Sequence, residues 1–236
     1  MSATPRKPPG FFAAAVLVAR KDLRIEGRTK ETLAASLLFA LVVLVVFAFA
    51  FDLDTVKRMG AGKVVPGILW VTLAFSAIVG FTRSFRLERA REALVAVALA
   101  PVDRGAIFVG KWLANLVLLT ALELILLPLT AVFFDADVVA CAGPLALVLG
   151  VHTLGLAALG TLFGGVVSRL GRGEALLATL LLPAATPLFL SAVHCTSSVL
   201  EGAPLSGDRK WLLITAGLDL LYVLVALVVF DAILEE

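Results

Sequence analysis

Six long runs of apolar residues, almost free of charged side chains, account for 133 of the 236 residues of this chain. The runs are 19 to 26 residues long and cover 32–51, 64–82, 112–134, 144–168, 175–200 and 211–230. Because a hydrocarbon core about 30 Å thick requires roughly 20 helical residues per crossing, the sequence predicts an all-α membrane protein with six transmembrane helices. Only 16% of the residues are charged, which excludes a soluble globular domain.

The positions of the basic residues indicate how the chain is oriented. If the N-terminus is cytoplasmic, 15 of the 20 Lys and Arg residues fall on the cytoplasmic side and five fall in outside loops. This is the positive-inside asymmetry of membrane proteins, and the loops are short enough for the rule to apply. We therefore expect both termini to be cytoplasmic. The net charge of +2 does not indicate a nucleic-acid partner.

Residues 1–31 contain a shorter apolar stretch, 11–19, followed by the basic sequence 20–24. Nine apolar residues are too few to cross a membrane, although they match the core of a signal peptide. Since basic residues directly after the stretch suit a mature secreted N-terminus poorly, we prefer an amphipathic elbow helix lying along the cytoplasmic interface. It is expected to turn at Gly27 into a single six-span domain formed by residues 32–236.

The longest connection, 83–111, lies on the cytoplasmic side, and its segment 84–99 is rich in strong helix formers. Pro101 ends this segment, and Asp103 is suited to cap the next helix. The apolar residues that fall at helical spacing are Leu87, Ala90, Leu94 and Val97. The basic residues around this stripe are Arg86, Arg89 and Arg91. The pattern predicts an amphipathic helix.

Two interpretations of the 84–99 helix remain open. It is either a solvated loop helix resting on lipid or a docking element whose apolar stripe fits a groove on a partner protein. We favour docking, because the chain has no domain outside the membrane that could supply energy, so active transport would require a partner protein.

Two acidic residues, Glu123 and Asp219, lie within apolar runs. A carboxylate at mid-bilayer costs at least ~2.5 kcal/mol, so both side chains are expected to face inward. One interpretation is gating or a proton relay. The other, which we prefer, is an interhelical polar clamp, for instance to backbone groups freed by Pro128.

The histidines are His152 and His194, and the cysteines are Cys141 and Cys195. Axial ligation of haem iron by His is chemically feasible, but a packed His bonded to a carbonyl is the more common arrangement. A disulfide between the two cysteines is compatible with a periplasmic location. Neither cysteine belongs to a zinc or redox motif, and no nucleophile–base constellation indicates an enzyme.

Residues 105–112 match the phosphate-loop pattern in seven of eight positions. The last position, which requires the hydroxyl of Ser or Thr for magnesium, is Trp112, and no strand precedes the motif. We therefore expect no ATP binding at this site.

Several motifs between about residue 20 and the C-terminus occur together. They are 66–71, 83–85 with 88–89, 100–105 with 110–111, Glu123 with Pro128, 153–163, 181–183 with Pro187, and the acidic tail 234–236. Together they resemble the CcmB family, the membrane subunits of the cytochrome c maturation haem exporter. Related type-2 ABC permeases share the architecture but not this set of motifs.

The resemblance implies a permease subunit of the bacterial inner membrane that forms a homodimer and carries no ATPase activity or bound cofactor of its own. A separate ATPase subunit, CcmA, would bind ATP-Mg and grip the 84–99 coupling helix. CcmC and CcmD would assist in releasing the haem-loaded chaperone CcmE, with haem as the cargo. The family usually has Gly-x-Leu-Glu in the coupling helix, whereas this chain has 92–95 as Glu-Ala-Leu-Val.

Two other functions remain open. One is a type-2 ABC permease for a lipid, glycan or drug. The other is a proton-coupled secondary transporter that uses Glu123 and Asp219, although the six runs show no inverted duplication.

Overall fold

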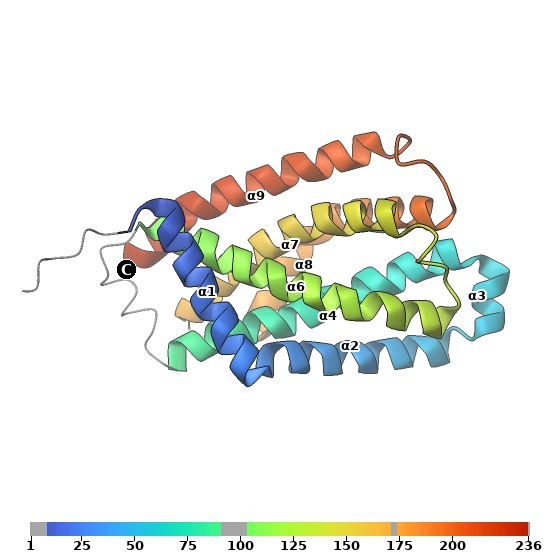
Figure 1. Cartoon of the computed structure of the whole chain (residues 1–236), viewed down its shortest axis with the longest axis horizontal. Coiled ribbons are helices and arrows are strands. Elements are labelled where there is room, and N and C mark those ends of the chain that lie inside the picture. Colours follow the sequence, from blue (N-terminus) through green and yellow to red (C-terminus); the bar gives the residue numbers. More distant parts are fainter. Residues whose placement is uncertain (1–8, 91–102, 171–173, 236) are drawn as a thin grey trace, which may run out of the picture.

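The structure is a computed structural model that describes residues 9–90, 103–170 and 174–235. Within these residues the regular structure is entirely α-helical, as predicted. The helices are α1 (Phe11–Thr29), α2 (Glu31–Ala50), α3 (Leu53–Met59), α4 (Ala61–Ala90), α6 (Arg104–Phe134), α7 (Ala142–Leu170), α8 (Glu174–Leu200) and α9 (Arg209–Glu235). Figure 1 shows the long helices running along the molecule, with α3 at one end and α1 crossing the other end obliquely.

Six of these helices are long and apolar enough to cross a membrane, which confirms the predicted number of spans. The six candidate spans are Glu31–Ala50, Ala61–Phe85, Arg104–Phe134, Ala142–Ser168, Ala175–Leu200 and Arg209–Phe230. The largest difference from the predicted runs is in the third span, whose helix begins at Arg104 rather than at Trp112. Asp103 caps this helix by accepting hydrogen bonds from the amides of Gly105 and Ala106, as its position predicted.

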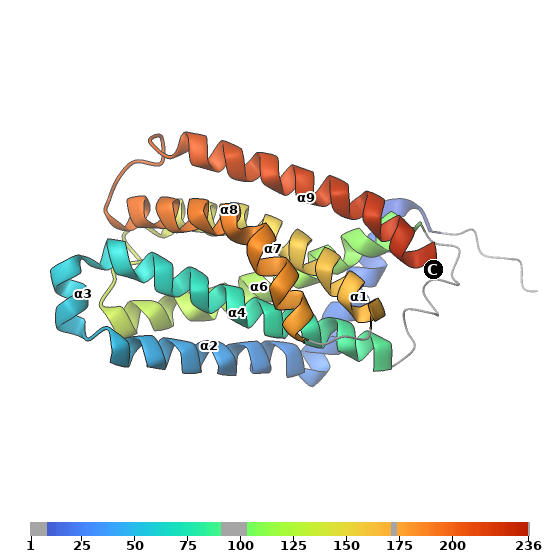
Figure 2. The same ribbon diagram turned by 180° about the vertical axis from the view of Figure 1, so that it is seen from behind.

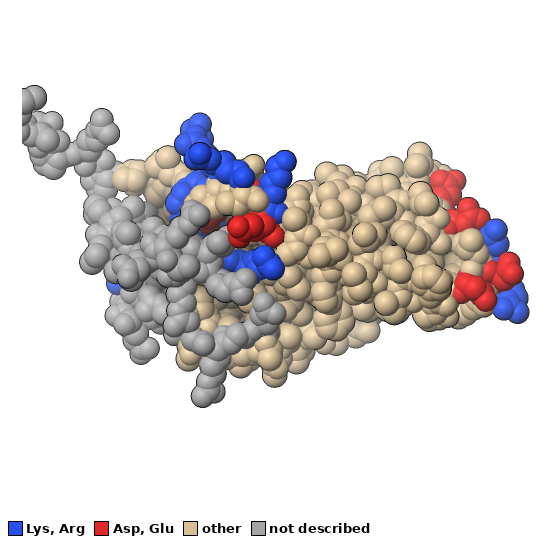
Figure 3. Space-filling view, turned by 90° about the horizontal axis from the view of Figure 1, so that it is seen from below, with Lys and Arg blue, Asp and Glu red and all other residues tan. Residues whose placement is uncertain are grey.

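Apart from Glu123 and Asp219, the charged side chains that the structure describes lie at the two ends of the bundle. On the face shown in Figure 3, Lys, Arg, Asp and Glu gather at the ends and leave an uncharged band between them. The start of α1 and the end of α9 lie at the same end (Figures 1 and 2). A bundle of six spans has this property, because each crossing reverses the direction of the chain.

The elbow between α1 and α2 is at Lys30, not at Gly27 as the sequence indicated. Lys30 adopts a left-handed backbone conformation with φ of 54°. Glu26 explains the position of the turn, since its carboxylate accepts a hydrogen bond of 2.8 Å from the amide of Leu33 in the first turn of α2. The first backbone N–H groups of a helix have no acceptor within the helix, and this bond supplies one for α2. The side chain of Glu26 reaches α2 while α1 continues past Gly27.

Helices α4 and α7 form the centre of the bundle. About 67% of the apolar window of α4 and 72% of that of α7 are buried, compared with 17% for α2 and 11% for α9. The glycines of α7 permit close packing, because the ring of Phe81 on α4 occupies the space that a side chain at Gly160 would need. The α2 and α9 helices therefore lie at the periphery.

The helix α8 remains continuous through Pro183 and Pro187. It is bent along its length (Figure 2), as expected where proline removes backbone hydrogen bonds. Tyr222 of α9 donates a hydrogen bond of 3.0 Å to the carbonyl of Ala184 between the two prolines. A neighbouring helix thus supplies a donor at the bend.

Replacing Gly160 by Val should lower the free energy of unfolding by ~1–3 kcal/mol, because the new side chain would overlap Phe81 and force α4 and α7 apart. Gly150→Val is the matched control, since Gly150 lies in the same helix and has no neighbouring atom within 4 Å of an added Cβ. Denaturation midpoints of the two variants in the same detergent measure the difference. Equal midpoints would show that the contact does not limit packing.

Candidate functional site

The predicted partner-binding residues lie at and beyond the C-terminal end of α4. This helix extends through its membrane span to Ala90, so Arg86, Leu87, Arg89 and Ala90 fall in its last turns. The rest of the predicted stripe lies outside the described residues: Arg91, Leu94, Val97 and Pro101. The segment that begins at Ser84 is therefore continuous with the second span, and no break separates the two before Ala90.

Glu123 lies at the middle of α6 and is 4% exposed. Its carboxyl oxygen Oε1 accepts a short hydrogen bond from the Thr153 hydroxyl of α7. This bond joins two helices, which is the arrangement of an interhelical clamp.

Asp219 of α9 lies against Gly155 of α7, where a side chain in place of the glycine hydrogen would overlap Oδ1. This oxygen is buried and makes no hydrogen bond in the described part of the chain. Thr153 and Gly155 are two residues apart and point to different sides of α7. Glu123 and Asp219 are thus separated by α7, which does not favour proton transfer between them.

His152 is fully buried and joins three helices. Its Nδ1 lies 2.7 Å from the carbonyl of Val148, and its Nε2 lies 3.0 Å from the Ser191 hydroxyl of α8 and 3.2 Å from the Thr215 hydroxyl of α9. Because a carbonyl only accepts, Nδ1 carries the proton, and Nε2 accepts from one of the two hydroxyls with its single lone pair. Both nitrogens are engaged, so coordination of haem iron by His152 requires this network to open.

His194 lies at the opposite end of the bundle from α1, and half of its side chain is exposed. Its Nε2 is 3.2 Å from Oδ1 of Asp208, which also accepts a hydrogen bond from the Ser198 hydroxyl. The ring packs against Trp211 at 5.0 Å between centroids. His194 therefore joins α8 to the start of α9 and is not part of the His152 network.

The cysteines do not form a disulfide, since both Cys141 and Cys195 are free. Cys195 is fully buried in α8, and Cys141 is partly buried before α7. Burial raises the pKa of the Cys141 thiol, which lowers the fraction of reactive thiolate.

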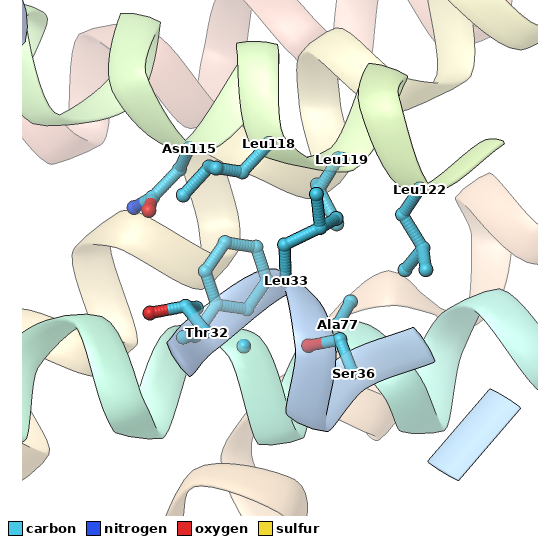
Figure 4. A pocket seen from close by; sticks show the side chains of 10 residues that line it. Thr32, Leu33, Ser36, Ala77, Asn115, Leu118, Leu119 and Leu122 are labelled. Carbon is cyan, nitrogen blue, oxygen red and sulfur yellow. The ribbon is translucent and has the colours of Figure 1, made fainter. Parts of the chain in front are cut away.

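A groove lies between α2, α4 and α6 (Figure 4). Thr32 and Ser36 of α2 and Asn115 of α6 supply polar atoms, and leucines from α2 and α6 supply much of the rest. The amide of Asn115 donates to the Thr161 hydroxyl of α7 at 2.9 Å. The cavity volume is about 20 Å³, which is room for about one water molecule and far below the roughly 300–1,000 Å³ of small-molecule pockets.

Sequence reasoning missed the polar contacts that join distant helices. Ser191 and Thr215 were not singled out, although each is a lone hydroxyl in an apolar run. Lys111 was considered only as part of sequence motifs, yet it is 2% exposed and lies 3.4 Å from the carboxylate of Asp22 in α1. A lysine directly before an apolar run was the available signal, but its partner is 89 residues away.

Comparison of the sequence with known protein families identifies the family of this chain. Residues 13–235, from α1 to the end of α9, match the family described as CcmB protein. The chain belongs to the CcmB family. The resemblance noted from about residue 20 therefore extends further into the elbow helix.

Three relatives of this CcmB-family chain carry the name Heme exporter protein B. The protein from Haemophilus influenzae is 31% identical over 195 residues, which cover 80% of this chain and 82% of the relative. The protein from Bradyrhizobium diazoefficiens is 26% identical, covering 78% and 81%. The protein from Pseudomonas aeruginosa is 27% identical, covering 83% and 86%. The similarity thus extends over most of both chains.

The Glu123–Thr153 clamp predicts an energetic coupling between α6 and α7. In a double-mutant cycle, Glu123→Leu and Thr153→Val should show a coupling energy between about 0.6 and 1.7 kcal/mol, the mean and the maximum measured for hydrogen bonds between membrane helices. Glu123→Gln should retain most of the stability, because its amide oxygen still accepts the bond. Unfolding of the four proteins in mixed micelles measures the coupling, and a value near zero would contradict the clamp.

Proposed function

We propose that this chain is the permease subunit of an ABC-type haem exporter for cytochrome c maturation. The observation that carries the proposal is the family match over residues 13–235, together with relatives named Heme exporter protein B. In this proposal the chain is embedded in the bacterial inner membrane with both termini in the cytoplasm. The asymmetric distribution of Lys and Arg supports this orientation.

The proposed role of the chain is to transmit motion. ATP-Mg would bind and be hydrolysed on a separate subunit, CcmA, which would dock against the 84–99 segment, whose first residues form the end of α4. Because α4 is continuous from Ala61 to Ala90, a force applied at its cytoplasmic end acts directly on a helix at the centre of the bundle. The spans would then change between two packed arrangements.

The groove between α2, α4 and α6 also bears on the role of this subunit. Its cavity volume of about 20 Å³ is far too small for a ligand as large as haem, and His152 has both nitrogens engaged. We therefore assign this chain to force transmission rather than to a resident haem site. Two copies would act together with CcmC and CcmD to release the haem-loaded chaperone CcmE.

Replacing Leu87 and Leu94 together by Asp should reduce the amount of ATPase that co-purifies with the tagged chain by at least about tenfold. Each leucine is proposed to bury apolar surface in a groove of the ATPase, and a buried leucine contributes about 1.5–3 kcal/mol. Mild extraction, followed by quantification of ATPase and chain in the same fractions, measures the effect.

Leu53→Asp is the control, because Leu53 is an exposed leucine of α3 at the opposite end of the bundle. It should leave ATPase recovery unchanged. Unchanged recovery with the Leu87 and Leu94 double variant would contradict docking at this segment. A wild-type complex that carries no haem-containing component but a bound lipid or glycan would favour the alternative cargo.

A further inference from the structure

The residues that resemble a phosphate loop, 105–111, form the contact between α6 and the elbow helix α1. Gly110 permits a close approach, because an added Cβ would lie 2.6 Å from both the carbonyl oxygen of Ala15 and Cβ of Val18. Ala14 and Ala15 of α1 are buried together with Ala106 of α6. Small residues on both sides thus bring the two helices into close contact, as Figure 1 shows for α1 crossing α6.

Lys111 adds a charge to this contact. Its ammonium group lies 3.4 Å from Oδ2 of Asp22, whose side chain is only 15% exposed. Asp22 also pairs with Lys21 at 3.1 Å. A buried lysine is costly unless its charge is paired. The position of Lys111 is therefore fixed by α1 and not only by its own helix.

The same ammonium group contacts a third helix. Its Nζ lies 4.9 Å from the centroid of the Phe85 ring at the cytoplasmic end of the α4 span. This distance is within the range of cation–π attraction. The Phe85 ring is buried and fills the space beside Gly164 of α7. One cation thus contacts α1 and the part of α4 that leads into the cytoplasmic segment.

We infer that Lys111 is a positioning residue that couples the elbow helix to the cytoplasmic end of α4. A displacement of α4 at Phe85 acts on the ammonium group, and the ion pair with Asp22 passes the displacement to α1. The elbow helix, the start of α6 and the end of α4 therefore move as one unit. A role of this coupling in haem export rests on the proposed function. The coupling itself depends only on the contacts within the fold.

Hydrogen exchange of the full chain in lipid nanodiscs tests the coupling directly. In Lys111→Met, amides of α1 and amides of α4 around Phe85 should both exchange at least about tenfold faster, because local opening becomes easier in both helices. Lys111→Arg retains the cation and should restore slow exchange. Faster exchange in α1 alone would overturn the inference, since Lys111 would then hold only the elbow.

The matched control is Lys57→Met. Lys57 pairs with Asp135 at 3.3 Å at the opposite end of the bundle, with 61% and 68% of the two side chains exposed. An exposed ion pair of this kind contributes little to stability, so hydrogen exchange should remain at the wild-type rate.

If Lys111→Met does not fold, Phe85→Leu provides the same test, because it removes the ring but retains an apolar side chain. It should accelerate exchange at the end of α4 and in α1, and an unchanged α1 would overturn the inference.

A second measurement uses the assembled complex. With Lys111→Met, ATPase recovery should equal that of the wild type, while release of haem-loaded chaperone per ATP hydrolysed should fall at least about fivefold. A purely structural role would lower the amount of complex but not this ratio, so an unchanged ratio would overturn the inference. A wild-type complex without ATP-dependent release would contradict the proposed function, and the exchange experiment would still decide the coupling.

Discussion

The packing of four helices on α7 determines the rest of this structure. Lipid tails are as apolar as leucine, so membrane helices associate through close packing and hydrogen bonds rather than through a hydrophobic driving force. The glycines of α7 provide the close packing. Phe81 and Phe85 of α4 fill the spaces at Gly160 and Gly164, and Phe230 of α9 lies at Gly165. Aromatic rings from two helices thereby fit into one glycine-rich surface.

The polar contacts of the interior converge on the same helix. Thr153 donates to Glu123 of α6, and Thr161 accepts from Asn115 of α6. The indole of Trp112 donates to the carbonyl of Leu154 at 3.1 Å, and His152 bonds to hydroxyls of α8 and α9. Since the hydrocarbon region offers no water as an alternative partner, these bonds fix the register of the neighbouring helices on α7. Glu123, one of the two acidic residues that invite a transport interpretation, thus also has a structural role.

The spans and the elbow were predictable because they depend on local composition. Apolar runs of 19 to 26 residues determine six crossings whatever their partners are. Features that depend on distant residues were not predictable. The turn lies at Lys30 rather than Gly27 because Glu26 caps α2. The predicted third run began at Trp112, so Lys111 was not expected to be buried. Its partner Asp22 belongs to another helix, and no local pattern connects the two.

The continuity of α4 also limits how motion can enter the bundle. A hinge at the end of the span would absorb a displacement, but the helix is unbroken from Ala61 to Ala90. Any displacement at its end must therefore move Phe81 and Phe85 relative to the glycine positions of α7. Because a ring either fills such a space or leaves it, the movement has discrete end points. Within the proposed function, this property would convert a gradual push by an ATPase into a switch between two packed states.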